Sequence, residues 1–348
     1  LLLSLVVWRV LSLEKILLGH AFQRNVSTSA YRNISFITSA AQKFSDKGYK
    51  TVYITSGKKS WSDLDLLFLN QGFTEIYDEF SILNKVQGAK NGRTWGVYDE
   101  YAYQFIEQLL NENTTQPIFI VLLTVTNHSP FEPPEEYIGG PIDISNISSI
   151  SPLVDNSKAQ QIVKTYQYAN NSLGNFISSI KNNDNLSENT IIAATGDHYL
   201  RILFNYPEDE IAWKFKVPFY LYLPKQYQQE TTKDLTRFGS HRDIFPTLYN
   251  RIFSETAYFN MGNDLLSTNF SANHEFSYND EFVMNTFGAI YSDKETEQKK
   301  YYRWQDDNSS KLTPLLEIDS EISNLLRISN AYESIKRNLS KMQLDTQN

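Results

Sequence analysis

The feature that most constrains this chain is an apolar run that ends in a glycine, a carboxylate and an imidazole, Thr190-Ile191-Ile192-Ala193-Ala194-Thr195-Gly196-Asp197-His198. A β-branched run without polar alternation is typical of a strand buried on both faces of a sheet. Open α/β sheets bind ligands just beyond the carboxyl ends of such strands. Neighbouring residues of a regular strand point to opposite faces, so Asp197 and His198 can face one ion only after the strand has ended. Gly196 provides that end.

The composition allows a large folded domain and excludes several kinds of chemistry. The chain has 348 residues, of which 41% are hydrophobic and 14% aromatic, enough for a sizeable core. It contains no cysteine, which excludes disulfides, thiolate nucleophiles and cysteine-ligated metal centres. The net charge of -8 disfavours nucleic acid as a partner, because no basic stripe is present to displace counterions.

Apolar runs and helical periodicity alternate along most of the chain. Strands are predicted over residues 50–55, 118–124, 190–195 and 217–223, and helices over residues 37–47, 98–110 and 159–181. This alternation predicts an α/β fold with a mostly parallel central sheet and helices on both faces.

The two ends of the chain carry weaker signals. Residues 278–302 are predicted as edge strands or a hairpin, and residues 315–342 as one or two helices. At the front, Arg9 interrupts an apolar start well before the roughly 20 residues that cross a bilayer. We therefore expect no membrane span in the chain as given.

A second polar group follows the predicted strand over residues 118–124, in the motif Thr126-Asn127-His128-Ser129-Pro130-Phe131. The strand brings Asn127 and His128 to the carboxyl edge of the sheet, and Pro130 turns the chain into a loop. His128 can donate a hydrogen bond to an anionic ester or protonate a leaving group, since imidazole titrates near neutrality. The alternatives are that His128 is a solvated histidine and that Asn127 only fixes the turn.

Asp197 and His198 are the candidate metal ligands. A carboxylate oxygen and an imidazole nitrogen suit manganese, zinc or magnesium and do not suit soft metals. The alternative is that Asp197 caps the turn after the strand while His198 is solvated.

Two further residues are candidates for substrate contact. Ser240 can cap a helix that begins near His241, and a helix start presents unpaired amide hydrogens to an anion. His241 faces either such a ligand or only the first turn. Trp61 follows the strand over residues 50–55 and either walls a substrate groove or belongs to the core.

The motifs occur along the chain in the order Gly48-Tyr49-Lys50-Thr51, Trp61, Gly72-Phe73, Thr126-Asn127-His128-Ser129-Pro130-Phe131, Leu173-Gly174, Gly196-Asp197-His198 and Ser240-His241-Arg242-Asp243-Ile244-Phe245-Pro246-Thr247-Leu248. In this order they resemble the sulfatase-like lipoteichoic acid synthase and phosphoglycerol transferase family, over about residues 12–266. That family belongs to the alkaline phosphatase and sulfatase superfamily.

The resemblance implies a function and a site. Members act on lipid-linked or glycan phosphoesters, transferring phosphoglycerol or cleaving related phosphate or sulfate esters of the cell envelope. Their catalytic domain is extracytoplasmic and tethered to the bacterial plasma membrane by N-terminal helices. The resemblance makes Asp197 and His198 ligands of a divalent metal, manganese before zinc or magnesium, and His128 a substrate-pocket residue. Trp61 matches a substrate-groove tryptophan, and we add Asn127 and His241 as predicted substrate-binding residues.

The front of the chain departs from the family pattern. Members begin this domain with a strand that ends in a metal-binding glutamate, followed by a threonine nucleophile shortly before a segment like residues 12–18. Here that place holds Trp8, Arg9, Val10 and Leu11, which cannot attack phosphorus, and Glu14 belongs to the following helix. We therefore expect a catalytic domain over residues 1–265 that lacks its first strand and nucleophile, as in a truncated or frameshifted gene, with a 266–348 extension packed on it.

Two positions near Trp61 also differ from the family. Ser56 stands where some members have histidine, and Asp63 stands where a basic residue is expected.

Two other functions stay open. One is a noncatalytic remnant or binding module that recognises an anionic glycan or lipid headgroup through His128 and Trp61. The other is a doubly wound nucleotide-binding protein. This alternative is disfavoured because no glycine-rich phosphate loop follows the first predicted strand.

Overall fold

The structure is a computed structural model, and its contacts divide the chain into two compact units. It describes residues 2–6, 13, 16–18, 32–92, 94–112, 115–145, 154–200, 202–228, 234–254, 256–268, 275–293, 296–305 and 311–345. The first unit comprises Leu1–Leu13, Phe22–Phe204 and Val217–Tyr227, and the second comprises Glu14–Ala21, Asn205–Lys216 and Gln228–Asn348.

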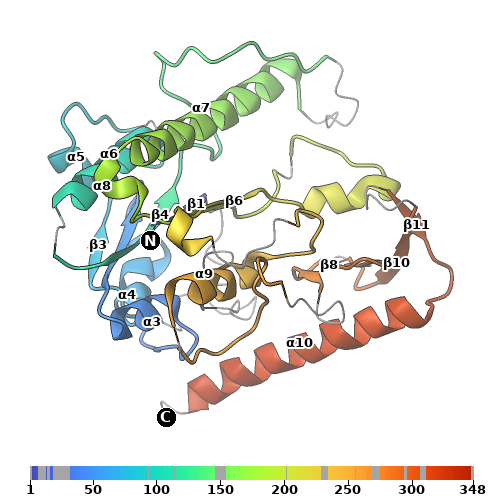
Figure 1. Cartoon of the computed structure of the whole chain (residues 1–348). Coiled ribbons are helices and arrows are strands. Elements are labelled where there is room, and N and C mark those ends of the chain that lie inside the picture. The colour runs from blue at the N-terminus through green and yellow to red at the C-terminus, as the bar shows by residue number, and fades with distance from the viewer. Residues whose placement is uncertain are drawn as a thin grey trace. The chain divides into compact units, whose positions relative to one another are not determined.

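A six-stranded sheet in the order β3-β2-β4-β1-β5-β6 forms the centre of the first unit (Figure 1). Its strands are β1 (Leu2–Val6), β2 (Lys50–Thr55), β3 (Glu75–Tyr77), β4 (Ile118–Thr124), β5 (Ile192–Gly196) and β6 (Phe219–Tyr222). The first five strands run parallel, and β6 runs antiparallel to β5. The predicted α/β fold with a mostly parallel sheet is confirmed.

β1 occupies the middle of this sheet, paired in parallel with β4 on one side and β5 on the other. We expected the first strand of the family pattern to be missing here, because the start of the chain departs from that pattern. Five residues, four of them apolar, are nevertheless enough for a strand between two parallel neighbours. β1 contains no carboxylate. The segment of Trp8 to Leu11, in which we expected a nucleophile to be missing, lies outside the described residues.

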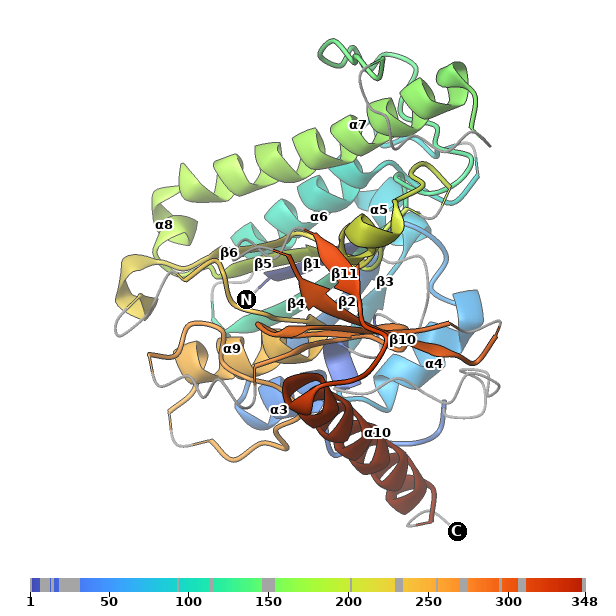
Figure 2. The same cartoon turned by 90° about the vertical axis from the view of Figure 1, so that its right-hand side faces the viewer.

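Helices cover both faces of the sheet (Figures 1 and 2). One face carries α5 (Glu79–Lys85), α6 (Asp99–Glu112), α7 (Asn156–Lys181) and α8 (Asp184–Ser187). The other face carries α3 (Ala40–Asp46) and α4 (Leu64–Leu69), which follows the short 3-10 helix η1 (Trp61–Asp63).

The packing on β4 explains its unbroken apolar sequence. All seven of its residues are buried. Ile120 and Leu122 pack with Phe105 of α6 and Phe176 of α7 in one core cluster. Phe119 points the other way, and its ring stacks on Phe44 of α3 at a centroid distance of 4.1 Å. Both faces of the strand therefore exclude water, as expected for the centre of a parallel sheet.

The second unit holds a five-stranded antiparallel sheet in the order β11-β10-β9-β8-β7. Its elements are η2 (Glu208–Phe215), η4 (His241–Asp243), α9 (Ile244–Ile252), β7 (Ser277–Tyr278), β8 (Phe282–Met284), β9 (Gly288–Ser292), β10 (Lys299–Trp304), β11 (Leu312–Pro314) and α10 (Ser320–Asp345). The segment over residues 315–342, predicted as one or two helices, contains one helix, α10. Its residues Ile322 and Leu325 pack on Val283 and Ile290 of the sheet. The predicted boundary near residue 265 stays a prediction.

Within the described ranges, no helix has the length and hydropathy needed to cross a bilayer.

Candidate functional site

The turn that leads from β4 to His128 is fixed by a buried carboxylate. Asp99, the first residue of α6, is 1% exposed. Its Oδ1 accepts hydrogen bonds from Val125 N at 3.1 Å, Thr126 N at 3.0 Å and Thr126 Oγ1 at 2.8 Å. Asp99 N donates back to Thr126 Oγ1 at 3.1 Å. Burial raises the pKa of Asp99, and these hydrogen bonds oppose that rise. The backbone before His128 is thereby tied to the start of a helix.

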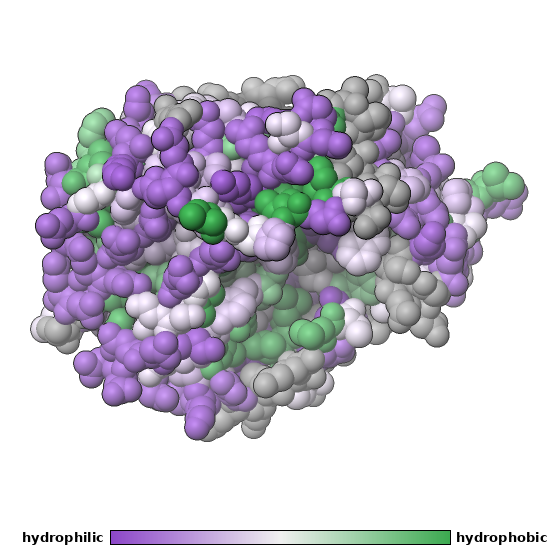
Figure 3. All heavy atoms as spheres, turned by 90° about the horizontal axis from the view of Figure 1, so that it is seen from above, coloured by the Kyte–Doolittle hydropathy of each residue, from purple (hydrophilic) through white to green (hydrophobic). Residues whose placement is uncertain are grey.

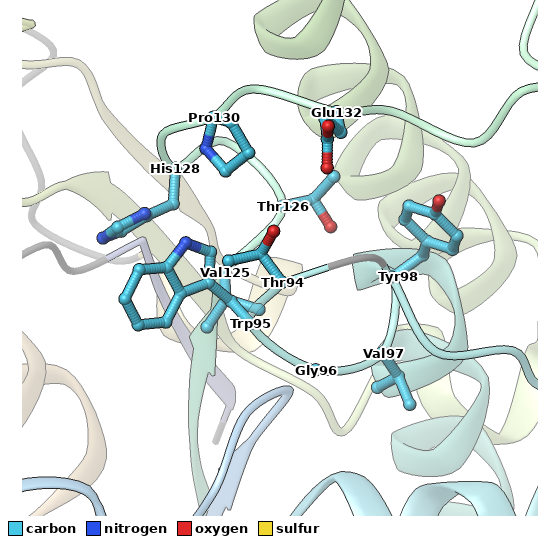
Figure 4. A pocket seen from close by; sticks show the side chains of 11 residues that line it. Thr94, Trp95, Gly96, Val97, Tyr98, Val125, Thr126, His128, Pro130 and Glu132 are labelled. Atoms are coloured by element: carbon cyan, nitrogen blue, oxygen red, sulfur yellow. The ribbon is translucent and has the colours of Figure 1, made fainter.

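Trp95 packs against His128, and sequence reasoning missed it (Figure 4). The two ring centroids lie 4.3 Å apart with an interplanar angle of 60°. Trp95 Nε1 also donates to the Ser129 carbonyl oxygen at 2.5 Å. The two rings line a small cavity of about 20 Å³, which Pro130 and Glu132 also line. The available signal was a tryptophan beside a glycine, just before the predicted helix over residues 98–110.

Gly96 allows the loop that carries Trp95 to cross the end of β2. Its φ is +137°, and a Cβ added there would lie 2.0 Å from the carbonyl oxygen of Ser56. Val97 N donates to the same oxygen at 2.8 Å. Only glycine combines this backbone conformation with so close an approach.

The imidazole of His128 has a defined hydrogen bond. Its Nδ1 lies 2.6 Å from the Ser129 carbonyl oxygen, and a carbonyl can only accept, so Nδ1 carries a proton. In this tautomer Nε2 is the ring nitrogen that can accept a proton. Burial lowers the pKa of His128, the bond to Ser129 raises it, and the nearby His198 lowers it, with a net decrease. His128 is therefore neutral at neutral pH.

This pKa predicts a pH dependence of stability. The unfolded chain binds a proton at His128 near pH 6.5, whereas the folded chain binds it only at lower pH. The free energy of unfolding therefore decreases as pH falls below about 6.5 towards the pKa of His128 in the folded protein. Urea unfolding at about pH 7 and pH 5 should show a smaller loss of stability in His128→Gln than in the wild type. An equal loss in both proteins would show that His128 does not contribute.

Asp197 and His198 follow β5 and face each other. β5 ends at Gly196, one residue beyond the end predicted at Thr195. Asp197 Oδ2 lies 3.1 Å from His198 Nε2, with the two side chains 5% and 21% exposed. His198 Nδ1 lies 2.6 Å from the Tyr199 carbonyl oxygen and so carries a proton. In the neutral ring, Nε2 then directs a lone pair at the carboxylate, and a cation or a second proton between the two atoms removes their repulsion.

The two atoms fit one divalent metal ion. Metal bonds of about 2.0 to 2.2 Å place neighbouring ligand atoms about 3.0 to 3.4 Å apart, depending on the angle at the ion. The separation of 3.1 Å between Asp197 Oδ2 and His198 Nε2 falls in this range. The hydrogen bond from Nδ1 to a carbonyl is the outer-shell contact that commonly orients a metal-binding histidine. Among the described residues, no group of three or more histidine, aspartate or glutamate side chains is arranged to hold a metal.

The other predicted site residues lie at three places. Asn127 is partly buried in the turn before His128. Trp61 begins η1 after β2 and is 42% exposed. His241 begins η4 in the second unit, where Ser240 N and Oγ donate to Asp243 Oδ2 at 2.7 and 3.1 Å. The helix start predicted at His241 is confirmed, and the substrate-binding roles of all three residues stay predictions.

Comparison with known proteins agrees with the motif order. The family model described as Sulfatase matches residues 27–252. Lipoteichoic acid synthase-like YvgJ of Bacillus subtilis is 28% identical over 271 residues, which cover 71% of this chain and 40% of that protein. The chain spans about two fifths of the length of the curated relatives it matches.

Solved structures show the same fold. The lipoteichoic acid synthase LtaP from Listeria monocytogenes aligns with a TM-score of 0.70 and 16% identity, over 97% of this chain and 81% of that one. A protein of the alkaline phosphatase superfamily from Vibrio parahaemolyticus aligns with a TM-score of 0.67 and 22% identity, over 93% of this chain and 76% of that one. Because the family model covers more than half of the 348 residues, the chain belongs to the sulfatase family.

Proposed function

We propose that this chain carries the metal-binding and ester-recognising side chains of an enzyme that transfers or hydrolyses phosphoglycerol or a related phosphate or sulfate ester of the bacterial cell envelope. The observation that supports this most strongly is the pairing of Asp197 with His198 at 3.1 Å beyond β5. His128 lies beyond β4 of the same sheet. It is close enough to His198 for that residue to lower the pKa of His128. We propose that the protein acts at the plasma membrane, with this domain outside the cytoplasm.

The chemistry divides between the two histidines. Asp197 and His198 would hold the divalent ion, manganese before zinc or magnesium, which offsets charge on the ester oxygens and lowers the pKa of a bound hydroxyl. His128 is neutral at neutral pH because burial lowers its pKa. Its Nε2 is therefore suited to accept a proton from an attacking acceptor hydroxyl. Trp95 and the Ser129 carbonyl hold this ring in place. We assign no nucleophile among the described residues.

A second function is a binding module without catalysis. It is supported by the finding that no group of three or more histidine, aspartate or glutamate side chains among the described residues is arranged to hold a metal. Such a module would recognise an anionic headgroup through His128 and Trp61.

Manganese titration followed by electron paramagnetic resonance tests the metal site. Asp197→Ala should weaken manganese binding by at least about tenfold, since one of two protein ligands is lost. Asp184→Ala removes an exposed carboxylate at the start of α8 and should leave the affinity unchanged. Equal affinity in the wild type and Asp197→Ala would refute the proposed site.

Calorimetry with glycerol phosphate separates the two functions. An ester-processing site should bind glycerol phosphate more tightly when manganese is present, because a divalent ion held by Asp197 and His198 would offset the charge of the phosphate. Affinity that does not depend on manganese would favour the binding module.

A further inference from the structure

A polar groove lies beside the His128 cavity in the first unit, and Glu132 lines both. The groove has a volume of about 550 Å³. Volumes of roughly 300 to 1,000 Å³ are usual for sites that bind small molecules. One wall is the loop after β4, which includes Pro133 and Glu135, and the other wall is α7.

The α7 wall is a stripe of polar residues. Ser157, Gln160, Gln161 and Lys164 line the groove, and their i, i+3, i+4, i+7 spacing places them on one face of the helix. Described side chains on the α7 side of the molecule are mostly hydrophilic (Figure 3). A neighbouring stripe of α7 is apolar and belongs to the core cluster of Phe131. The helix therefore uses one face for packing and a separate polar face for the groove.

The loop that forms the opposite wall is anchored to α7 at two points. At the first, Lys158 Nζ and Gln161 Nε2 donate to the Pro130 carbonyl oxygen at 2.8 and 3.4 Å. At the second, Asn171 Nδ2 donates to Tyr137 OH at 2.7 Å. These bonds tie the loop to α7 in the absence of a ligand, and such pre-organisation lowers the entropic cost of binding.

The lining indicates the chemistry of the ligand. Glu132 and Glu135 accept hydrogen bonds, while Ser157 and Gln160 both donate and accept. Lys164 is the cation among the lining residues, against two carboxylates, so a phosphate group would meet net repulsion. Pairs of hydroxyl groups suit carboxylates and amides, and Pro133 and Ile142 add apolar surface for the C–H faces of a ring.

We propose that this groove binds a neutral saccharide. Because it adjoins the His128 cavity and disfavours anions, it would hold the uncharged acceptor of the transfer rather than the phosphoester itself. The acceptor role rests on the proposed function, whereas saccharide binding does not.

Saturation-transfer NMR tests the groove without metal or ester. The probes are maltose, cellobiose, gentiobiose, lactose and sucrose, each titrated to about 50 mM, since single-site sugar affinities are expected in the millimolar range. At least one should bind saturably to the full chain. Gln160→Ala and Glu135→Gln should each weaken that binding by about fivefold, the effect of one lost hydrogen bond. Asn170→Ala changes an exposed α7 residue outside the groove lining and should bind like the wild type.

Two results would overturn the saccharide site. One is the absence of saturable binding by all five sugars, and the other is binding that neither groove variant weakens while both variants melt like the wild type. Saccharide binding combined with unchanged manganese affinity in Asp197→Ala would keep the groove and refute the metal site, so the two proposals fail separately.

Discussion

Replacing Gly96 with alanine is expected to destabilise the first unit by roughly 3 to 5 kcal/mol. Two costs combine at this residue. Its φ of +137° is unfavourable for any side chain, and the new Cβ would lie 2.0 Å from Ser56 O and 2.7 Å from Gly57 Cα. Both of these atoms belong to the backbone, so the loop that carries Trp95 would have to move away from β2. Urea unfolding measures the loss.

Gly88→Ala is the matched control for this substitution. Gly88 has a φ of +80°, but nothing lies within 4 Å of a Cβ added there. It should lose only the conformational cost, about 1 to 2 kcal/mol. Similar losses in the two variants would contradict the close approach of the Trp95 loop to β2.

Replacing Asp99 with alanine is expected to cost about 3 to 5 kcal/mol. The substitution leaves Val125 N and Thr126 N without their acceptor, and an unsatisfied buried amide costs roughly 1 to 3 kcal/mol. The Thr126 hydroxyl also loses its acceptor, so the turn that leads to His128 should loosen. The free energy of unfolding measures the cost. Asp99→Asn keeps one acceptor oxygen and should lose less.

Asp155→Ala serves as the comparison for Asp99→Ala. Asp155 caps α7 through a single exposed hydrogen bond to Lys158 N at 2.8 Å. Loss of such a cap costs about 1 kcal/mol. If Asp99→Ala were no more harmful than Asp155→Ala, the turn before His128 would not depend on the buried carboxylate.

The main strands and helices of the first unit were predictable because their buried positions hold apolar residues in a recognisable pattern. The β4 run was predicted with its observed bounds, since a strand covered on both faces is apolar throughout. The strand predicted from residue 190 begins two residues later, at Ile192. The direction of β6 was not predictable, because apolar content does not distinguish parallel from antiparallel pairing. β1 was missed because a strand of five residues, four of them apolar, carries little periodicity.

The candidate site was predictable only where the chain places its residues next to each other. Asp197 and His198 were found because a glycine visibly ends their strand. Trp95 and Asp99 were missed because their partners lie 34 and 27 residues further along the chain. An acidic residue at a helix start normally indicates a surface cap, and nothing local shows that Asp99 is buried. Tertiary contacts of this kind need the fold before they can be inferred.

Crystals of the chain grown with manganese chloride provide the most direct measurement. Anomalous difference density is expected at a position bonded to both Asp197 Oδ2 and His198 Nε2, at about 2.0 to 2.2 Å from each. Manganese bound elsewhere, or crystals in which these two side chains turn away from each other, would contradict a metal-dependent site at the end of β5.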